Sequence, residues 1–96
     1  MVLEETKTKP GRDFYKLFYN LYTRNNINGN KIVKIREVLA LGRNTKIEVL
    51  VGEDKVFEFF VRPSQDYLTR VNDMAIVKVY QYFKRLEKSA DIDQRY

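Results

Sequence analysis

The first strong pattern in the chain is an amphipathic helix. Within residues 12–24, apolar side chains recur at positions i, i+3, i+4, i+7 and i+8, which is the spacing of one helix face. These side chains are Phe14, Leu17, Phe18, Leu21 and Tyr22. Pro and Gly precede the segment and a run of Asn and Gly follows it, as is typical of helix ends. We therefore predict a helix over residues 12–24, with residues 1–11 as a flexible basic arm.

A β-hairpin is predicted in the middle of the chain. Residues 46–51 alternate between polar and apolar side chains, and residues 56–61 are rich in β-branched and aromatic ones. Gly52-Glu53-Asp54 lies between them, and Pro63 ends the second run. The two adjacent carboxylates could hold a metal ion, but an acidic pair in a tight turn is usually only a turn. We assign no metal site.

Residues 31–41 fit either a strand or a helix. As a strand, the segment places its apolar residues on one face, and only Glu37 is out of place. As a helix, it aligns a different apolar set, and Gly42 would cap the end. We prefer the strand, because β-branched residues such as Ile32, Val33 and Ile35 lose side-chain freedom in a helix.

Helical spacing returns over residues 64–88, after Ser64 as a suitable N-cap, and residues 89–96 are expected to form a frayed tail. The order of elements predicts a single α+β domain over residues 12–88. Its architecture would be a two-layer αβββα sandwich, in which two helices cover the apolar face of a three-stranded antiparallel meander.

Positive charge is concentrated in the first half of the chain. The net charge is +5, but between Lys7 and Lys46 ten basic residues stand against two acidic ones. Such an imbalance favours a polyanionic partner. Alternation along the predicted strands also gathers basic residues on the polar face of the sheet. We therefore predict nucleic-acid binding, with RNA favoured over DNA, through Lys31, Lys34, Arg36, Arg43, Lys46, Arg62, Arg12 and Lys16.

Aromatic residues suggest a second kind of contact. The chain has seven Tyr and six Phe, more than a small two-layer core needs. Tyr15 and Tyr19 lie one turn apart beside the buried helix face, and Phe60 falls on the polar sheet face by alternation from Phe59. Exposed apolar surface usually marks an interface. We therefore predict a homodimer, or a heterodimer with a subunit of the same fold, through Tyr15, Tyr19 and Phe60.

The composition argues against an enzyme. The chain contains no Cys and no His, which excludes thiolate nucleophiles, zinc–thiolate sites and the commonest general base. We assign no catalytic residue, no cofactor and no small-molecule substrate. No run of 18 apolar residues is present, and the start of the chain lacks the apolar segment of a secretory signal. The expectation is a cytoplasmic protein with no membrane span.

Several short segments resemble the nine-kilodalton Alu-domain subunit of the signal recognition particle. Asp13-Phe14 and Leu21-Tyr22 are similar to the ends of its first helix. Residues 32–36 resemble its first strand, and residues 44–49 resemble the entry to its hairpin. The resemblance covers roughly residues 12–88. It implies a ribonucleoprotein subunit that forms a heterodimer with a sister subunit and binds structured RNA on a joint sheet surface.

Two other functions remain open. If residues 31–41 are helical, the segment continuing to Thr45 has the rhythm of a helix-turn-helix, and the hairpin would be a wing. The protein would then be a small DNA-binding regulator, of the kind found in viruses among other sources. Alternatively, the aromatic residues bind another protein, which would make the chain a protein–protein interaction module.

Overall fold

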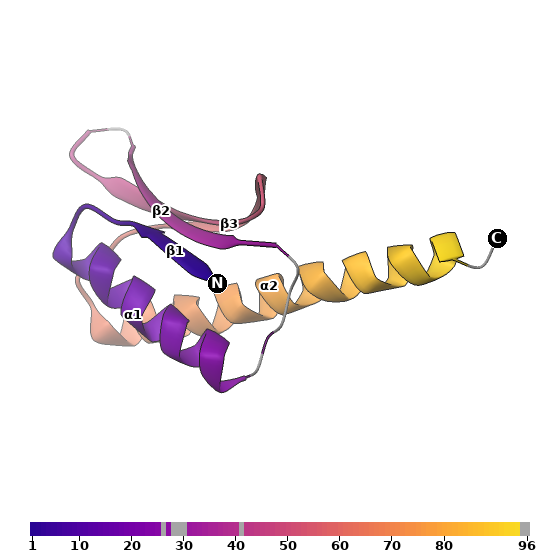
Figure 1. Ribbon diagram of the computed structural model, residues 1–96. Helices are drawn as coiled ribbons and strands as arrows, with labels where there is room; N and C mark the ends of the chain where they lie inside the picture. Colours follow the sequence, from indigo (N-terminus) through magenta and orange to yellow (C-terminus); the bar gives the residue numbers. More distant parts are fainter. Residues whose placement is uncertain (26, 28–30, 41, 95–96) are drawn as a thin grey trace.

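The computed structural model describes residues 1–96 except 26, 28–30, 41, 95 and 96 (Figure 1). The described residues form four strands and two helices in the order β-α-β-β-β-α. They are β1 (Val2–Glu5), α1 (Lys9–Arg24), β2 (Val33–Leu39), β3 (Thr45–Val51), β4 (Asp54–Phe60) and α2 (Gln65–Gln94).

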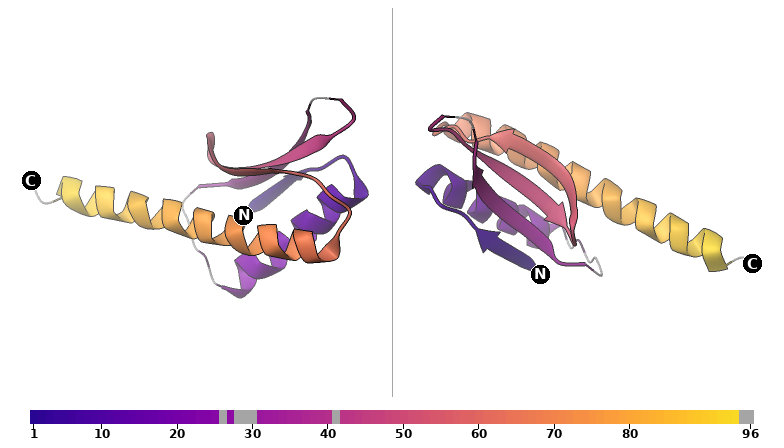
Figure 2. Two further views of the ribbon diagram at one scale, coloured as in Figure 1. Left: turned by 180° about the vertical axis from the view of Figure 1, so that it is seen from behind. Right: turned by 90° about the horizontal axis from the view of Figure 1, so that it is seen from above.

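The strands form one mixed sheet in the order β1-β2-β3-β4. β1 pairs with β2 in parallel, whereas β2, β3 and β4 pair antiparallel. Both helices lie against the same face of the sheet, and the opposite face carries no helix (Figures 1 and 2). The predicted three-stranded αβββα sandwich is therefore wrong, because a fourth strand precedes α1 and extends the sheet at the β2 edge.

Residues 1–11, expected to be a flexible arm, hold β1 and the start of α1. Alternation cannot reveal so short a strand, in which Val2 is the one buried residue. Its pairing with Val33 is also non-local, since α1 and the following loop separate the two strands in sequence. The strand propensity of these few residues therefore does not predict that they pair with β2.

Residues 33–39 form a strand, as preferred from the sequence, and this excludes the helix-turn-helix interpretation. Val33, Ile35 and Glu37 point to the helix layer and are buried, while Lys34 and Arg36 point to the outer face. The β-branched run thus takes the extended form in which its side chains pack well.

The core lies between the sheet and the two helices. From α1, Phe14 and Phe18 are fully buried, and the ring centroids of Phe14 and Phe59 lie 4.7 Å apart. From α2, Leu68 and Ala75 continue the same cluster. Burying several whole aromatic side chains supplies much of the hydrophobic stabilisation of so small a domain.

The helix α2 is longer than expected and runs on past the sheet (Figure 1). Its backbone stays helical over residues 89–94, which were expected to fray. The buried side chain of Asn72 donates a hydrogen bond from Nδ2 to the carbonyl oxygen of Phe14 at 3.1 Å and joins α2 to α1.

Glu37, the residue that seemed misplaced in its strand, joins three segments of the chain. Its side chain is only 1% exposed. Oε1 accepts hydrogen bonds from the backbone N–H groups of Lys7 (2.6 Å) and Thr8 (2.8 Å). Oε2 accepts from the hydroxyl groups of Thr8 (2.7 Å) and Thr45 (2.6 Å). The carboxylate thus ties the β1–α1 turn and the start of β3 to β2.

The same contact positions the first turn of α1. Thr8 is the N-cap, and its Oγ1 accepts a hydrogen bond from the N–H of Gly11 at 3.1 Å while donating to Glu37. A negative charge is also favourable beside a helix N-terminus. Burial alone would raise the pKa of Glu37, but the hydrogen bonds from Thr45, Thr8 and the backbone outweigh it and hold the pKa below its ordinary value.

Glu37→Gln should therefore lower the free energy of unfolding at pH 7 by about 2–4 kcal/mol, because a buried amide cannot accept all four hydrogen bonds. A lowered pKa means that the carboxylate stabilises the fold above the ordinary glutamate range. That contribution is lost as the pH falls through the folded-state value. Urea unfolding of both proteins between pH 7 and pH 3 should show the difference shrinking with acid. A constant difference would contradict this account, and Glu53→Gln in an exposed turn serves as the control.

Gly11→Ala should destabilise the protein although alanine is the better helix former. A Cβ at position 11 would lie 2.3 Å from Oε1 of Glu37, whose hydrogen bonds prevent it from moving aside. We expect the free energy of unfolding, measured by chemical denaturation, to fall by about 1–3 kcal/mol. Asn20→Ala, at an exposed position of the same helix, should be neutral or slightly stabilising. A stable Gly11→Ala protein would show that the carboxylate is not held in place.

Candidate functional site

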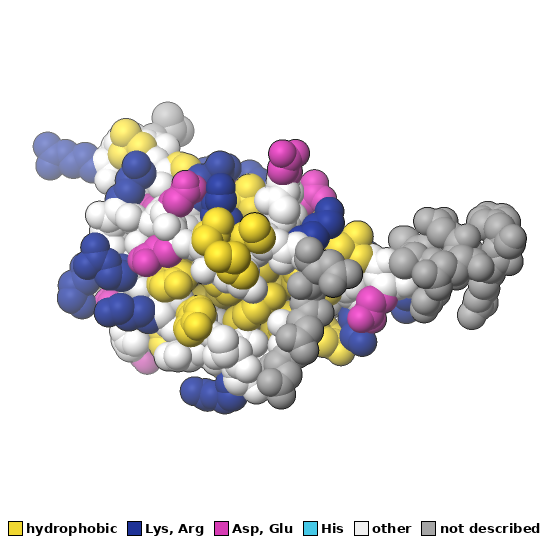
Figure 3. All heavy atoms as spheres, viewed as in Figure 1, with side chains coloured by type: hydrophobic (Ala, Val, Ile, Leu, Met, Phe, Trp, Pro, Cys, Tyr) yellow, Lys and Arg dark blue, Asp and Glu magenta, His cyan; other side chains and the backbone are white. Residues whose placement is uncertain are grey.

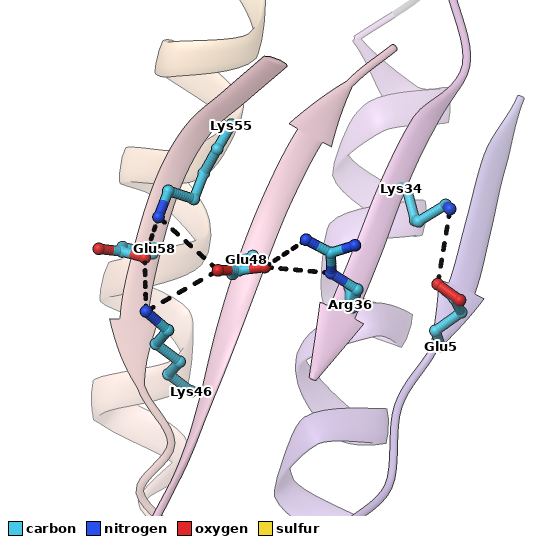
Figure 4. Close-up of polar contacts among 7 residues, drawn as sticks. All are labelled: Glu5, Lys34, Arg36, Lys46, Glu48, Lys55 and Glu58. Carbon is cyan, nitrogen blue, oxygen red and sulfur yellow. Dashed lines mark hydrogen bonds and ion pairs between the residues drawn. The ribbon is translucent and has the colours of Figure 1, made fainter. Parts of the chain in front are cut away.

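The outer face of the sheet carries a band of charged side chains across all four strands (Figure 4). The register aligns Glu5 with Arg36, Arg36 with Glu48, and Glu48 with Glu58. The members of this band, which we call the ion-pair band, are Glu5, Lys34, Arg36, Lys46, Glu48, Lys55 and Glu58.

Glu48 is the centre of the ion-pair band. One of its oxygens accepts hydrogen bonds from Nε of Arg36 at 3.0 Å and from a terminal nitrogen of the same guanidinium at 2.7 Å. The other lies 3.8 Å from Nζ of Lys46 and 3.7 Å from Nζ of Lys55. The hydrogen bonds from Arg36 and the positive charges of both lysines outweigh desolvation and hold the pKa of Glu48 below its ordinary value.

The flanking carboxylates engage the remaining cations. Glu58 lies 3.1 Å from Nζ of Lys46 and 2.7 Å from Nζ of Lys55, and these contacts lower the pKa of Glu58. At the other edge, Glu5 lies 3.5 Å from Nζ of Lys34. Every cation of the band therefore faces at least one carboxylate. The band holds four cations and three carboxylates, so its charge is close to neutral.

The structure brings together only some of the basic residues selected from the sequence. Lys34, Arg36 and Lys46 share the outer face. Arg12 and Lys16 are exposed on α1, on the other side of the sheet. The remaining three are exposed elsewhere, before β2, in the β2–β3 turn and after β4: Lys31, Arg43 and Arg62. These residues do not form one continuous basic surface.

Sequence reasoning missed Lys55 because of a local irregularity in the strand. Simple alternation from Phe59 and Phe57 would turn Lys55 toward the helices. The register shifts between Val49 and Leu50, which pairs Lys55 with Leu50 and places it on the outer face. Glu5 was missed because the strand that carries it was not expected.

The residues selected for an aromatic interface also lie apart. Tyr15 and Tyr19 pack against each other on α1, with ring centroids 6.1 Å apart. Phe60 is 56% exposed on the outer sheet face. On the neighbouring strand it pairs with Lys46, which in turn pairs with Val38 on β2. Beside Val38, Leu39 is 73% exposed. By alternation from Glu37, Leu39 points to the helix side of the sheet. We call Val38, Leu39 and Phe60, which lie at one corner of the sheet, the apolar corner.

The apolar corner adjoins a hollow of about 540 Å³, formed between the β1–α1 turn and β2. Its walls include Thr6, Lys7, Val38 and Leu39. The space-filling view shows apolar side chains interrupting the charged surface of the protein (Figure 3). Apolar groups beside a concavity are a feature of surfaces that bind other molecules.

Two other features are absent from the part of the chain that the structure describes. No group of three or more metal-ligating side chains occurs there. In the same part of the chain, no helix is both long and apolar enough to cross a membrane.

Comparison with protein families identifies the family of the chain. Residues 1–95 match the model of the family described as curli assembly protein CsgE. No curated protein matches the chain, and no solved structure matches it.

This match overturns the resemblance to the Alu-domain subunit of the signal recognition particle. The segments that carried the resemblance are only two to six residues long, too short to identify a family. The predictions of an RNA-binding protein, a ribonucleoprotein subunit and a nucleic-acid partner are wrong with it, as is the DNA-binding alternative. The third interpretation, a protein–protein interaction module, agrees better with the family.

Glu48→Gln should destabilise the protein more than Glu58→Gln does. Without the central charge, Arg36, Lys46 and Lys55 remain close together but lose the anion that they share. The free energy of unfolding should therefore fall by about 1–2 kcal/mol. Glu58 is the matched control, because it meets two of the same cations at a more exposed position. Thermal unfolding at low and high salt measures both effects. Equal losses for the two variants would contradict the central role of Glu48.

Proposed function

Because the chain belongs to the family of the curli assembly protein CsgE, we propose that it acts in curli assembly as a non-enzymatic protein that binds other proteins. The observation that carries this proposal is the extent of the match, which includes residues 1–95 of 96. Every element of the fold thus lies within the matched region.

The outer sheet face supports a protein partner over a polyanion. A phosphate backbone would have to compete with Glu5, Glu48 and Glu58 for the cations of the ion-pair band. A protein partner can instead bury apolar side chains and leave the ion pairs at the rim of the contact, where they add specificity. The apolar corner supplies such side chains at one end of the sheet, with Val38 and Phe60 on this face and Leu39 on the helix side.

A deletion experiment in the host tests the proposal directly. Removing the gene should abolish or strongly reduce extracellular curli, and supplying the intact chain should restore them. Electron microscopy and the quantity of polymerised curli subunit measure the outcome. Normal curli in the deletion strain would overturn the proposed function.

The apolar corner makes a residue-level prediction. Leu39→Ala combined with Phe60→Ala should lower curli production several-fold in the complemented strain, because burying two such side chains contributes about 3 kcal/mol or more to a protein contact. The protein should still fold, since both side chains are mostly exposed. Met74→Ala combined with Leu86→Ala is the control, at exposed apolar positions of α2. Equal curli levels with both double variants would contradict a role for the corner.

A further inference from the structure

A second hollow lies at the opposite end of β4 from Phe60 of the apolar corner. It measures about 570 Å³ and is formed between the start of β4 and the second half of α2. This volume falls within the range of protein pockets that hold ligands. We call it the basic hollow, and its lining residues are Asp54, Lys55, Val56, Lys78, Tyr80, Gln81, Tyr82, Lys84 and Arg85.

The charge of the basic hollow is strongly asymmetric. Four cations and one carboxylate line it. The carboxylate belongs to Asp54 and accepts a hydrogen bond from the hydroxyl of Tyr82, which raises the pKa of Tyr82. Tyr82 thereby joins α2 to the start of β4 across the hollow. This hydrogen bond engages the one carboxylate among the lining residues.

Two of the cations are available for a partner. Lys55 pairs with Glu48 and Glu58, and Lys84 lies 3.4 Å from Glu87. Among the described side chains, neither Lys78 nor Arg85 forms an ion pair. They lie seven positions apart on α2, which places them about two turns apart on the same side of the helix.

The floor of the basic hollow is aromatic and apolar. The guanidinium of Arg85 lies 5.9 Å from the ring centre of Tyr82, and Nζ of Lys84 lies 5.4 Å from that of Tyr80. Such contacts hold long cationic side chains beside the rings. Val56, half-buried, adds apolar surface. The hollow thus offers positive charge over a floor on which a side chain can pack.

We propose that the basic hollow binds an acidic peptide segment of a protein partner, with Lys78 and Arg85 contacting its carboxylates. The proposal rests on the proposed function, because it assigns that function a specific docking point. Charge complementarity identifies the occupant. Carboxylates would meet two cations that form no ion pair with the described side chains, beside an aspartate that is already hydrogen-bonded. The spacing of the two cations along α2 suits a segment that runs beside the helix.

Fluorescence anisotropy with a labelled decapeptide of alternating Glu and Gly tests the proposal on the intact chain. The peptide should bind, binding should weaken as salt rises, and a Gln-Gly peptide of equal length should not bind. Lys78→Gln combined with Arg85→Gln should weaken binding about tenfold, as expected for the loss of two exposed ion pairs. Failure of the Glu-Gly peptide to bind at low salt would overturn the proposal.

Lys16→Gln combined with Arg70→Gln is the matched control, because it removes the same charge from exposed positions outside the hollow. It should change affinity by about twofold or less. An equal loss in both double variants would overturn the proposal by showing a response to net charge alone. Equally tight binding of a single-stranded oligonucleotide, lost in the same variant, would overturn it in favour of a general polyanion site. Circular dichroism and melting temperature verify that each variant is folded.

The curli assay separates the two proposals. If peptide binding fails while the gene deletion still abolishes curli, the basic hollow is wrong and the proposed function stands. If the deletion leaves curli normal, the proposed function fails whatever the peptide does.

Discussion

The buried carboxylate of Glu37 is the contact on which the arrangement of this fold depends. A charged group can remain in an apolar layer only when hydrogen bonds replace its lost water. Here four such bonds come from the β1–α1 turn and from the first residue of β3. The same carboxylate holds the N-cap of α1 and leaves no room for a side chain at Gly11. The position of β1 and the start of α1 both follow from it.

On the outer sheet face, the pairing of charges is more informative about the kind of partner than the net charge of the chain. The chain carries an excess of positive charge, yet its cations on this face are paired with carboxylates from neighbouring strands. Ion pairs in mixed networks add specificity and keep a sheet surface soluble without attracting polyanions. The excess charge that remains unpaired lies elsewhere, including the second half of α2.

The two candidate contact areas lie at different places on the molecule and differ in chemistry. The apolar corner would contribute buried hydrophobic area, which gives most of the affinity of a protein contact. The basic hollow would contribute charge complementarity, which accelerates and orients association. A protein that acts in an assembly process can use both, because separate surfaces allow it to meet two segments of a partner, or two partners, together.

Local sequence patterns were sufficient to identify the helix and strands that bury one regular face. The apolar face of α1, the strand character of residues 33–39 and the alternation of β3 could all be read directly, because each buries one side of a regular element. Candidate surface positions such as Lys34, Arg36 and Phe60 followed from the same alternation. Function did not follow, because a basic and aromatic composition is compatible with several kinds of partner.

Only the tertiary structure decided the features that depend on residues far apart in the chain. The four residues of β1 become a strand because β2 supplies the hydrogen-bonding edge, and Glu37 becomes a core residue because distant donors surround it. A single irregularity between β3 and β4 turned Lys55 outward and added it to the ion-pair band beside Glu48. Alternation is a local rule with a period of two, so it cannot report a register shift, a parallel neighbour or the partner of a charge.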